Sequence, residues 1–451
     1  MATRRDFLKG LGGALGAVVL TSSCGSGGGS SSNNNTSLIP NGYRFFRVLT
    51  TGDPLPEGNT LFAMPGAAMI NSRNELFVYG LDQADRSGFY ELLLDFGGSR
   101  PAVLRARKVI REGDVLKDSK VVDQVTSGDV NDLGSFAAVV KTTDNLSGLY
   151  LERQKSGFEP VAGYLTGMPN GAGKFGSFFG DVDIHDNDNI LFVAQYAPYG
   201  IVQGRQGLIY LPGGEVNEKG SIVTSTADLI PETGGFISGL GLVDMHDNGN
   251  YVLQAYGMSQ AMITGQKVSA GAGRLDAEAA SMLITGNVKD PFTRTLRSIS
   301  SSIPVKKSTA ARPGFTYGEL RYGPRIGNSN KAAFVVHVNG SHMVMVYDGN
   351  PVISTGSLSP LGNPVSSVAA PVVGADGLLY YQAVTEQGME LVVYNGVDSK
   401  TILTNGDTVD GAVLRSLFFG FMTEQVDKAG RVVFTADFED GNTSLVIGIP
   451  V

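Results

Sequence analysis

The sequence of 451 residues contains no tryptophan, one cysteine and only four histidines. The single cysteine, Cys24, excludes an intrachain disulfide, an iron–sulfur cluster, a thiolate zinc site and haem attachment through cysteine pairs. Charged residues make up only 17% of the chain, whereas 42% is hydrophobic and 61 residues are glycine. This length and composition suit one large all-β domain or two ordinary domains.

The first 23 residues have the character of an export signal. The stretch TRRDFLKG, which includes Arg4 and Arg5, resembles the twin-arginine signal, and the apolar run LGGALGAVVL follows it. A run of ten residues is too short to cross a bilayer but has the length of a signal-peptide core. We therefore expect export by the twin-arginine route, with an amphipathic N-terminal helix as the alternative.

The stretch LTSSC resembles a bacterial lipobox, in which the cysteine is lipidated and becomes the first residue of the mature protein. Leu20 lies one position further from Cys24 than usual, so a plain signal peptide cleaved nearby is the alternative. Residues 24–39 are rich in Gly, Ser and Asn, which is typical of a flexible tether. We expect this tether to hold a domain of residues 40–451 at a membrane, in the periplasm or on the cell surface.

The charge balance restricts the partners of this domain. Removal of the signal takes away three basic residues and one acidic residue, so the mature chain is more acidic than the −8 of the whole sequence. An acidic domain repels nucleic acid and anionic lipid surfaces. We therefore expect no nucleic-acid partner, membrane contact through the lipid on Cys24, and envelope proteins or glycans as partners of a monomer.

The body of the chain repeats one motif seven times. Each copy has Gly, Asn or Asp at its fifth position and an apolar residue at its ninth. These three residue types tolerate positive φ, so the fifth position predicts a hairpin turn, and the alternation after it predicts a half-buried strand. The copies begin at Ile70, Val130, Ile184, Met245, Ile326, Val373 and Val426, and their fifth residues are Asn74, Gly134, Asp188, Gly249, Asn330, Gly377 and Gly430.

A second strand motif, closed by a glycine, alternates with the first. Together with the strands before and between the two motifs, it gives four strands per repeat, and seven such units predict a seven-bladed β-propeller. The chain ends on a third strand, so the early strand YRFFRVLTTG is expected to complete the last blade and remove an open edge. An open solenoid with capping repeats is the alternative. The closing glycines are Gly52, Gly113, Gly167, Gly234, Gly286, Gly356 and Gly406.

The fifth repeat is the longest because of residues 291–320, which are basic within an acidic domain. We interpret this segment as an insertion that forms a solvated loop. The alternative is a partner-binding loop on one face of the propeller, because loops on rigid scaffolds often carry binding residues.

Two of the four histidines, His185 and His246, occupy the second position of the repeated motif. Asn71, Asn131 and Asp427 hold that position in other copies, so we expect a side chain that caps its own turn. The alternative is a calcium site, because adjacent blades would bring two carboxylate-rich turns to one face. The candidate metal ligands are Asp183, His185, Asp186, Asp188, Asp244, His246 and Asp247.

The sequence predicts no catalytic residue and no cofactor besides calcium. The stretch GAGKFG matches a dinucleotide-binding glycine pattern, but a strand follows it where a helix is required, so we interpret it as an interblade loop. Neither G-x-S-x-G nor H-E-x-x-H occurs. Quinone-dependent propeller dehydrogenases typically have tryptophan-rich blades and copper propellers need many histidines, so neither class fits.

Three functions from different classes stay open, and one of them is a structural envelope component with no small ligand. An acid–base pair on different blades leaves no local spacing, so a hydrolase or lyase acting on an extracellular polymer is another. That enzyme requires carboxylates or histidines that converge at one mouth of the channel. A binding module instead predicts an exposed aromatic or apolar patch.

The repeated motif, idealised as N-x-x-G-x-x-x-F, resembles the tandem repeat of a family of bacterial exported proteins that carry various choices of anchor. The stretches DKAGRVVF and NSRNELFV carry the likeness, which extends over residues 40–451. Asp, Gly or His replaces the leading Asn in five of the seven copies. The resemblance implies a propeller-like exported protein without assigned catalytic residues. We expect an envelope-anchored lipoprotein that works as a binding or interaction scaffold.

Overall fold

A computed structural model describes residues 38–451 apart from several internal gaps. Within the described ranges, no helix reaches the length and apolar character that a membrane crossing requires. The residues outside the description are 1–37, 57–59, 65–67, 199–203, 218, 227, 231–234, 247, 259–279, 300–316, 328–330, 339–341 and 421–423.

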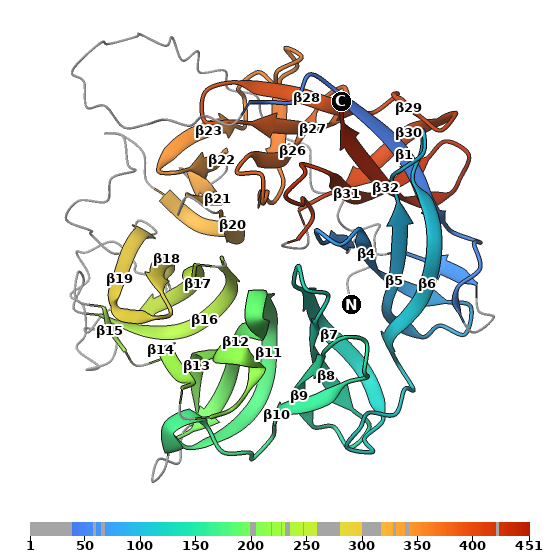
Figure 1. Ribbon diagram of the computed structural model, residues 1–451. Coiled ribbons are helices and arrows are strands. Elements are labelled where there is room, and N and C mark those ends of the chain that lie inside the picture. Colours follow the sequence, from blue (N-terminus) through green and yellow to red (C-terminus); the bar gives the residue numbers. More distant parts are fainter. Residues whose placement is uncertain are drawn as a thin grey trace, which may run out of the picture.

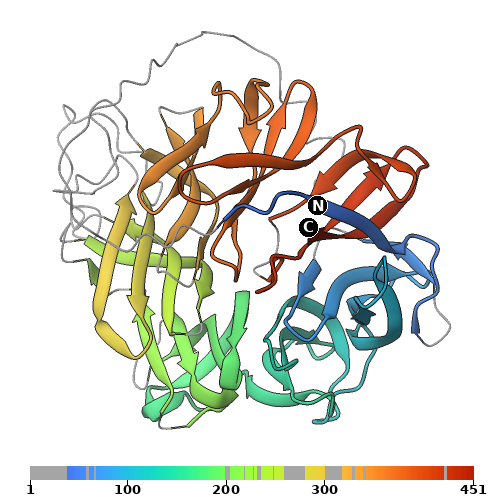
Figure 2. The same ribbon diagram turned by 45° about the horizontal axis from the view of Figure 1, so that its top comes forward.

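Seven antiparallel sheets are arranged in a ring, and the chain passes through them in sequence order (Figures 1 and 2). This is the seven-bladed β-propeller that the repeat predicts, with four main strands in each blade. Blade 1 contains β2 (Leu61–Ala63), β3 (Ala68–Ile70), β4 (Glu75–Asp82), β5 (Ser87–Asp95) and β6 (Ala102–Arg111); blade 2 contains β7 (Val122–Val130), β8 (Phe136–Thr142), β9 (Ser147–Glu152) and β10 (Glu159–Gly163); blade 3 contains β11 (Lys174–His185), β12 (Asn189–Ala197), β13 (Arg205–Leu211) and β14 (Ser221–Ser225).

The remaining four blades follow the same order of strands. Blade 4 contains β15 (Leu229–Ile230), β16 (Gly235–Met245), β17 (Asn250–Met258), β18 (Ala280–Asn287) and β19 (Asp290–Ile299); blade 5 contains β20 (Tyr317–Ile326), β21 (Ala332–Val338), β22 (His342–Tyr347) and β23 (Asn350–Ser354); blade 6 contains β24 (Val365–Val368), β25 (Val372–Val373), β26 (Leu379–Thr385), β27 (Gly388–Tyr394) and β28 (Ser399–Thr404); blade 7 contains β29 (Thr408–Val409), β30 (Ala412–Phe418), β31 (Val432–Phe438), β32 (Thr443–Pro450) and β1 (Tyr43–Thr50).

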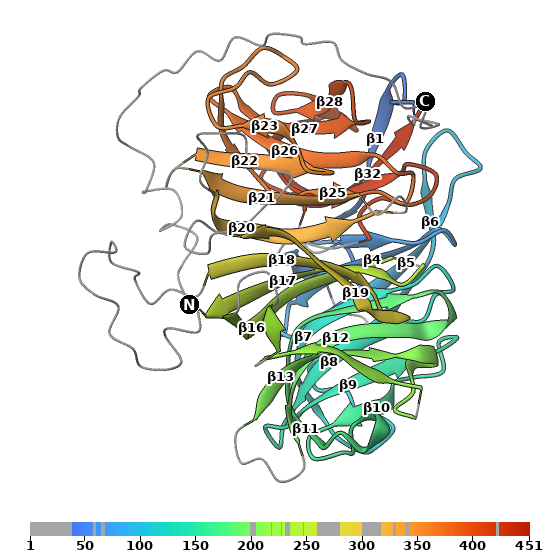
Figure 3. The same ribbon diagram turned by 90° about the vertical axis from the view of Figure 1, so that its left-hand side faces the viewer.

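The first and last strands meet in blade 7, where β1 pairs antiparallel with β32 (Figure 3). The register runs from Tyr43 opposite Pro450 to Thr50 opposite Ser444. The side chain of Phe46 is 8% exposed and belongs to the core shared by blades 7 and 1. The prediction that the early strand completes the last blade is therefore confirmed, and this pairing closes the ring.

The turn after the innermost strand has the left-handed residue that the repeat predicts. Every described residue at the fifth position of the motif has a positive φ, while Asn330 lies outside the described residues. The φ values are 65° at Asn74, 81° at Gly134, 58° at Asp188, 86° at Gly249, 82° at Gly377 and 71° at Gly430.

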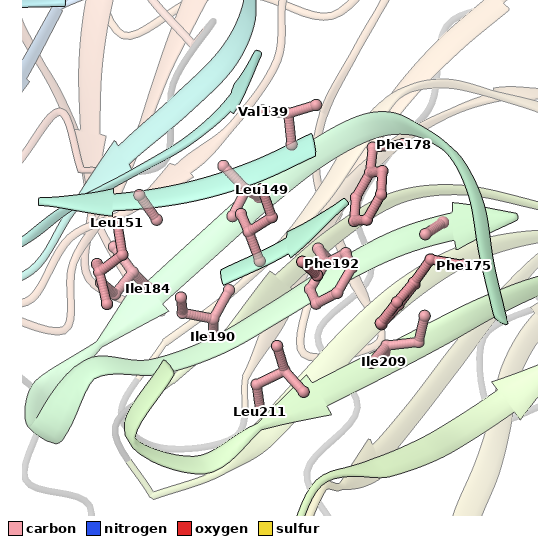
Figure 4. Close-up of a cluster of buried hydrophobic side chains, with 14 of the residues drawn as sticks. Val139, Leu149, Leu151, Phe175, Phe178, Ile184, Ile190, Phe192, Ile209 and Leu211 are labelled. Atoms are coloured by element: carbon pink, nitrogen blue, oxygen red, sulfur yellow. The ribbon is translucent and has the colours of Figure 1, made fainter. Parts of the chain in front are cut away.

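Alternating apolar side chains from neighbouring blades pack together between the sheets. In Figure 4, Val139, Leu149 and Leu151 of blade 2 lie against the cluster that includes Phe178 and Phe192 of blade 3. The two phenylalanine rings stack with centroids 5.8 Å apart. Complete burial of such a side chain stabilises the fold by about 1.5–3 kcal/mol, so each interblade layer holds the ring together.

Blade 4 differs from the strand assignment made on the sequence. Gly286 lies inside β18, the third strand, and does not close an outer strand. The outer strand is β19, which takes the beginning of the segment 291–320, and β20 takes its end. Within that segment, residues 300–316 lie outside the described residues. Gly234, the closing glycine expected before the fourth copy of the motif, also lies outside them.

Candidate functional site

The turns after the innermost strands surround a cavity of about 50 Å³ at the centre of the ring. Residues from six of the seven blades line it, since blade 1 contributes no lining residue. The polar lining residues are Asn131, Asp132, His185, Asp186, Asp244, His246, Arg325, Glu424, Asp427 and Lys428.

A buried aspartate precedes the repeated motif by one residue in blades 2, 3 and 4. Its Oδ2 atom accepts a hydrogen bond from a backbone N–H at the start of the motif in the next blade. Buried polar groups need such partners, so these carboxylates connect four consecutive blades. The pairs are Asp129 with Ile184 at 3.0 Å, Asp183 with Met245, and Asp244 with Ile326 at 2.5 Å.

Burial and mutual repulsion raise the pKa of several carboxyl groups around the cavity. Burial, followed by the charge of Asp183, raises the pKa of Asp129 well above its ordinary value and that of Asp244 to about 7. Burial, followed by the charge of Asp129, also raises the pKa of Glu424 well above the ordinary value. These groups retain protons at a pH where exposed carboxyls are ionised.

The second position of the motif caps its own turn in three blades. The Oδ1 atom of Asn71 accepts hydrogen bonds from the backbone N–H groups of Arg73 at 3.0 Å and Glu75 at 3.1 Å. Asn131 and Asp427 make the same two bonds in blades 2 and 7. The turn-capping interpretation is confirmed for these residues.

The two histidines depart from that pattern to different degrees. Nδ1 of His246 accepts from the backbone N–H of Asn248 at 3.5 Å, a long contact. His185 makes no capping bond, and its Nε2 atom lies 2.9 Å from Oδ1 of Asp183. Residues i and i+2 share one face of a strand, so His185 reaches Asp183 instead of its own turn, and the turn-capping prediction is wrong there. The two imidazole rings have centroids 6.2 Å apart.

The candidate metal ligands are only partly brought together. The Asp188 carboxylate pairs with Nε of Arg153 at 2.9 Å and accepts from Nδ2 of Asn131 at 3.1 Å, so it is directed to these partners. Asp247 lies outside the described residues. Among the residues that the structure describes, no three His, Cys, Asp or Glu side chains are grouped as a metal would require. Calcium binding at these turns stays a prediction.

Arg325 and Glu424 are among the cavity residues that the sequence analysis did not select. Arg325 is 5% exposed and stands one residue before the fifth copy of the motif, where blades 2 to 4 have their aspartates. An alignment of that preceding position would have singled out the arginine. Glu424 stands two residues before the last copy, and nothing in its spacing marks it.

Histidine and carboxylate side chains do gather around the central cavity, which is the kind of convergence that the enzyme hypothesis requires. However, the carboxylates of Asp129, Asp183 and Asp244 each accept a backbone hydrogen bond from the next blade. Their positions are therefore explained by the connection between blades. Arg4, Arg5 and Cys24, the residues expected to direct export and lipidation, lie outside the described residues.

Comparisons with known proteins give a fold-level likeness only. No family model matches the sequence, and no curated protein matches it. A puromycin-hydrolysing peptidase of Mycobacterium tuberculosis is 12% identical with a TM-score of 0.43, over 85% of this chain and 50% of that one. Prolyl oligopeptidase B of Galerina marginata is 12% identical with a TM-score of 0.43, over 88% of this chain and 47% of that one. The lectin BP39L of Burkholderia pseudomallei is 10% identical with a TM-score of 0.38, over 86% of this chain and 97% of that one. The chain spans about half the length of the two peptidases.

Proposed function

We propose that this protein is an envelope-anchored lipoprotein whose propeller is a binding or interaction scaffold. The observation that supports it best is the use of the central carboxylates. Asp129, Asp183 and Asp244 connect neighbouring blades through backbone hydrogen bonds, which leaves a rigid closed ring around a small polar cavity. A rigid ring with exposed loops on both faces presents binding groups at fixed positions.

The anchor is tested by the variant Cys24→Ala, compared with Ser23→Ala as a matched control. Lipidation needs the thiol, so the Cys24→Ala protein should leave the membrane fraction, whereas Ser23→Ala should stay there. Replacement of both Arg4 and Arg5 by Lys should block export and keep the protein in the cytoplasm. Equal distribution of the Cys24→Ala and wild-type proteins between fractions would refute the anchor.

The scaffold role is tested by native mass spectrometry of the protein purified from its own envelope. We expect the polypeptide with its lipid and a noncovalently bound glycan or envelope protein at fixed stoichiometry. A metal analysis of the same sample measures calcium at the two acidic turns. A lipidated polypeptide that binds neither glycans nor envelope proteins in any fraction would contradict the scaffold.

The second candidate is a hydrolase or lyase acting on an extracellular polymer. The observation in its favour is that Glu424, whose pKa is raised by burial, shares the cavity with His185 and His246. A carboxyl whose pKa is raised holds its proton to higher pH than an exposed carboxyl and can act as a general acid. Turnover of envelope polysaccharide by the wild type and its loss in Glu424→Gln would establish the enzyme, whereas the scaffold predicts no turnover.

A further inference from the structure

Arg325 is a buried cation in the wall of the central cavity. It is 5% exposed, and it occupies the position at which blades 2 to 4 carry an aspartate that bonds to the next blade. An arginine has no acceptor atom, so it cannot continue that series of carboxylate-to-backbone bonds. Its presence at the end of the series therefore needs another explanation.

The guanidinium of Arg325 lacks a direct anionic partner among the described residues. Its Nη1 atom donates to the carbonyl of the preceding residue, Pro324, at 3.2 Å, and its Nε atom has no hydrogen-bond partner there. The nearby carboxylate of Asp244 is directed to the backbone N–H of Ile326. The charge of Arg325 partly offsets the raised pKa of the buried carboxyls of Asp181 and Asp244, but neither forms a direct ion pair with it. A buried guanidinium without a direct ion pair is costly, so this arrangement is suited to a ligand that completes the pairing.

Unlike Arg325, the second cation of the cavity wall, Lys428, has an anionic partner within the protein. Nζ of Lys428 lies 2.5 Å from Oδ2 of Asp132, so its charge is compensated within the protein. Arg431, next to the cavity residue Asp427, is likewise paired with that residue's carboxylate. Arg325 thus differs from the neighbouring cations, since no ion pair joins it to any residue within the described ranges.

We infer that Arg325 binds a small carboxylate group in the central cavity, an inference that rests on the proposed role as a binding scaffold. A carboxylate matches the planar guanidinium with two parallel hydrogen bonds. The cavity of about 50 Å³ has room for such a group, since one water needs about 10–15 Å³.

A monoanion is favoured over a dianion such as phosphate. The single guanidinium of Arg325 compensates one negative charge, so the second charge of a dianion would be buried in this cavity without a partner, which is costly. The imidazoles of His185 and His246 also line the cavity, and an imidazole N–H is a further hydrogen-bond donor.

The test titrates the purified, lipidated protein with sodium acetate at constant ionic strength. Binding is followed by broadening of the acetate methyl signal in NMR spectra and by the melting temperature, which rises when a ligand binds the folded state. We expect saturable binding in the millimolar range. Methylammonium chloride and sodium phosphate are the matched cation and dianion probes, and both should bind at least tenfold more weakly than acetate.

The variant Arg325→Met should weaken acetate binding at least tenfold, and Arg325→Lys should retain part of it, since an ammonium cannot form the parallel pair. Arg111→Met is the matched control, because Arg111 is also 5% exposed but is paired with Asp82 at 3.1 Å and does not line the cavity. If that variant does not fold, Arg153→Met, at a residue paired with Asp188, replaces it.

The carboxylate can belong to a free acid or to a larger molecule, and polyglutamate distinguishes the two. Binding of acetate alone indicates a small acid, and binding of both indicates a carboxylate presented by a larger partner. Stronger binding of methylammonium, equal acetate affinity in Arg325→Met and wild type, or no acetate binding by folded protein would each overturn the inference. A glycan or protein partner that still binds Arg325→Met would leave the scaffold proposal standing without the carboxylate site.

Discussion

The Oδ2 atom of Asp129 in β7 accepts a hydrogen bond of 3.0 Å from the backbone N–H of Ile184 in β11. The acceptor belongs to blade 2 and the donor to blade 3, and the same relationship joins blade 3 to blade 4 and blade 4 to blade 5. A bond of this kind fixes the distance between the inner ends of adjacent blades. It explains why carboxylates gather around the axis of the ring.

Substitution of Asp129 separates the acceptor role of this side chain from its charge. Asp129→Asn keeps an acceptor oxygen for the Ile184 N–H, whereas Asp129→Leu leaves that N–H unsatisfied, which costs about 1–3 kcal/mol of unfolding free energy. Because burial raises the pKa of Asp129, ionisation destabilises the folded state as pH rises above the unfolded pKa. Asp129→Asn should therefore be as stable as wild type at pH 4 and more stable at pH 8.

Denaturant unfolding at both pH values, followed by far-ultraviolet circular dichroism, measures these differences. An equal loss of stability in Asp129→Asn and Asp129→Leu would show that the hydrogen bond to the next blade is not the relevant interaction.

The left-handed turn residue is tested with three alanine variants. Gly134 has φ +81°, and a Cβ atom there would lie 2.7 Å from Oε2 of Glu75. Gly52 has φ +96° with nothing within 4 Å, and Gly167 has neither a positive φ nor a close neighbour. We expect a loss of about 1–2 kcal/mol for Gly52→Ala from the backbone alone, a larger loss for Gly134→Ala, and almost none for Gly167→Ala.

Thermal melting curves of the three variants measure these losses, and they can be compared directly because all three changes add the same methyl group. A melting temperature of Gly134→Ala equal to that of Gly167→Ala would contradict the turn assignment. Gly134→Val should lower the melting temperature further than Gly134→Ala, because a β-branched residue resists positive φ.

A hydrogen-bonded series of hydroxyl and carboxyl groups at blade 6 should make the stability of the folded protein depend on pH. Tyr380 donates its hydroxyl hydrogen to Oδ2 of Asp376 at 2.6 Å, and the Tyr43 hydroxyl lies 3.0 Å from that of Tyr380. Burial raises the pKa of Asp376 to about 6. Since the folded pKa exceeds the unfolded one, this group contributes stability that is present at pH 4 and lost as pH rises through 6.

Asp376→Asn should remove this dependence while it keeps the acceptor for the backbone N–H of Leu378. A shift of roughly two pKa units corresponds to at most about 3 kcal/mol, and partial exposure of Asp376 reduces that value. Unfolding free energies at pH 4, 5.5 and 7.5 should rise toward acid in the wild type more than in Asp376→Asn. The exposed Asp398→Asn is the control and should follow the wild type; a parallel pH profile for all three proteins would refute the assignment.

The architecture could be predicted from the sequence because the turn restricts residue type so strongly. Asn74, Gly134 and Asp188 occupy a backbone region that most residues avoid, so the motif marks each blade independently of its other residues. The strands of blade 4 were harder to assign, because residues 260–265 (QAMITG) and 281–286 (SMLITG) have the same pattern of apolar residues before a glycine. Only pairing with β17 identifies the stretch around Gly286 as the third strand.

The cavity was less predictable, since its contacts join blades that are some sixty residues apart in sequence. Asp129 and Asp183 share a position in the repeat, but only the ring shows that each carboxylate meets a backbone N–H of the next blade. Arg325 breaks that series and so was not part of any repeated pattern. Sequence repeats reveal what the blades have in common, whereas the candidate site depends on how they differ.

The closure of the ring by β1 gives the last prediction. Phe46 is 8% exposed and packs in a core with Leu445 and Ile447 of β32, so Phe46→Ala should lower the unfolding free energy by about 3–5 kcal/mol. Leu104 of β6 is the control, since it is 63% exposed, and Leu104→Ala should change the unfolding free energy by less than about 0.5 kcal/mol. Hydrogen exchange should show that Phe46→Ala exposes the backbone amides of β32 before those of blades 2 and 3, because loss of β1 opens blade 7 first. Uniform exchange across all blades, or unchanged stability of Phe46→Ala, would mean that the ring holds together without this strand.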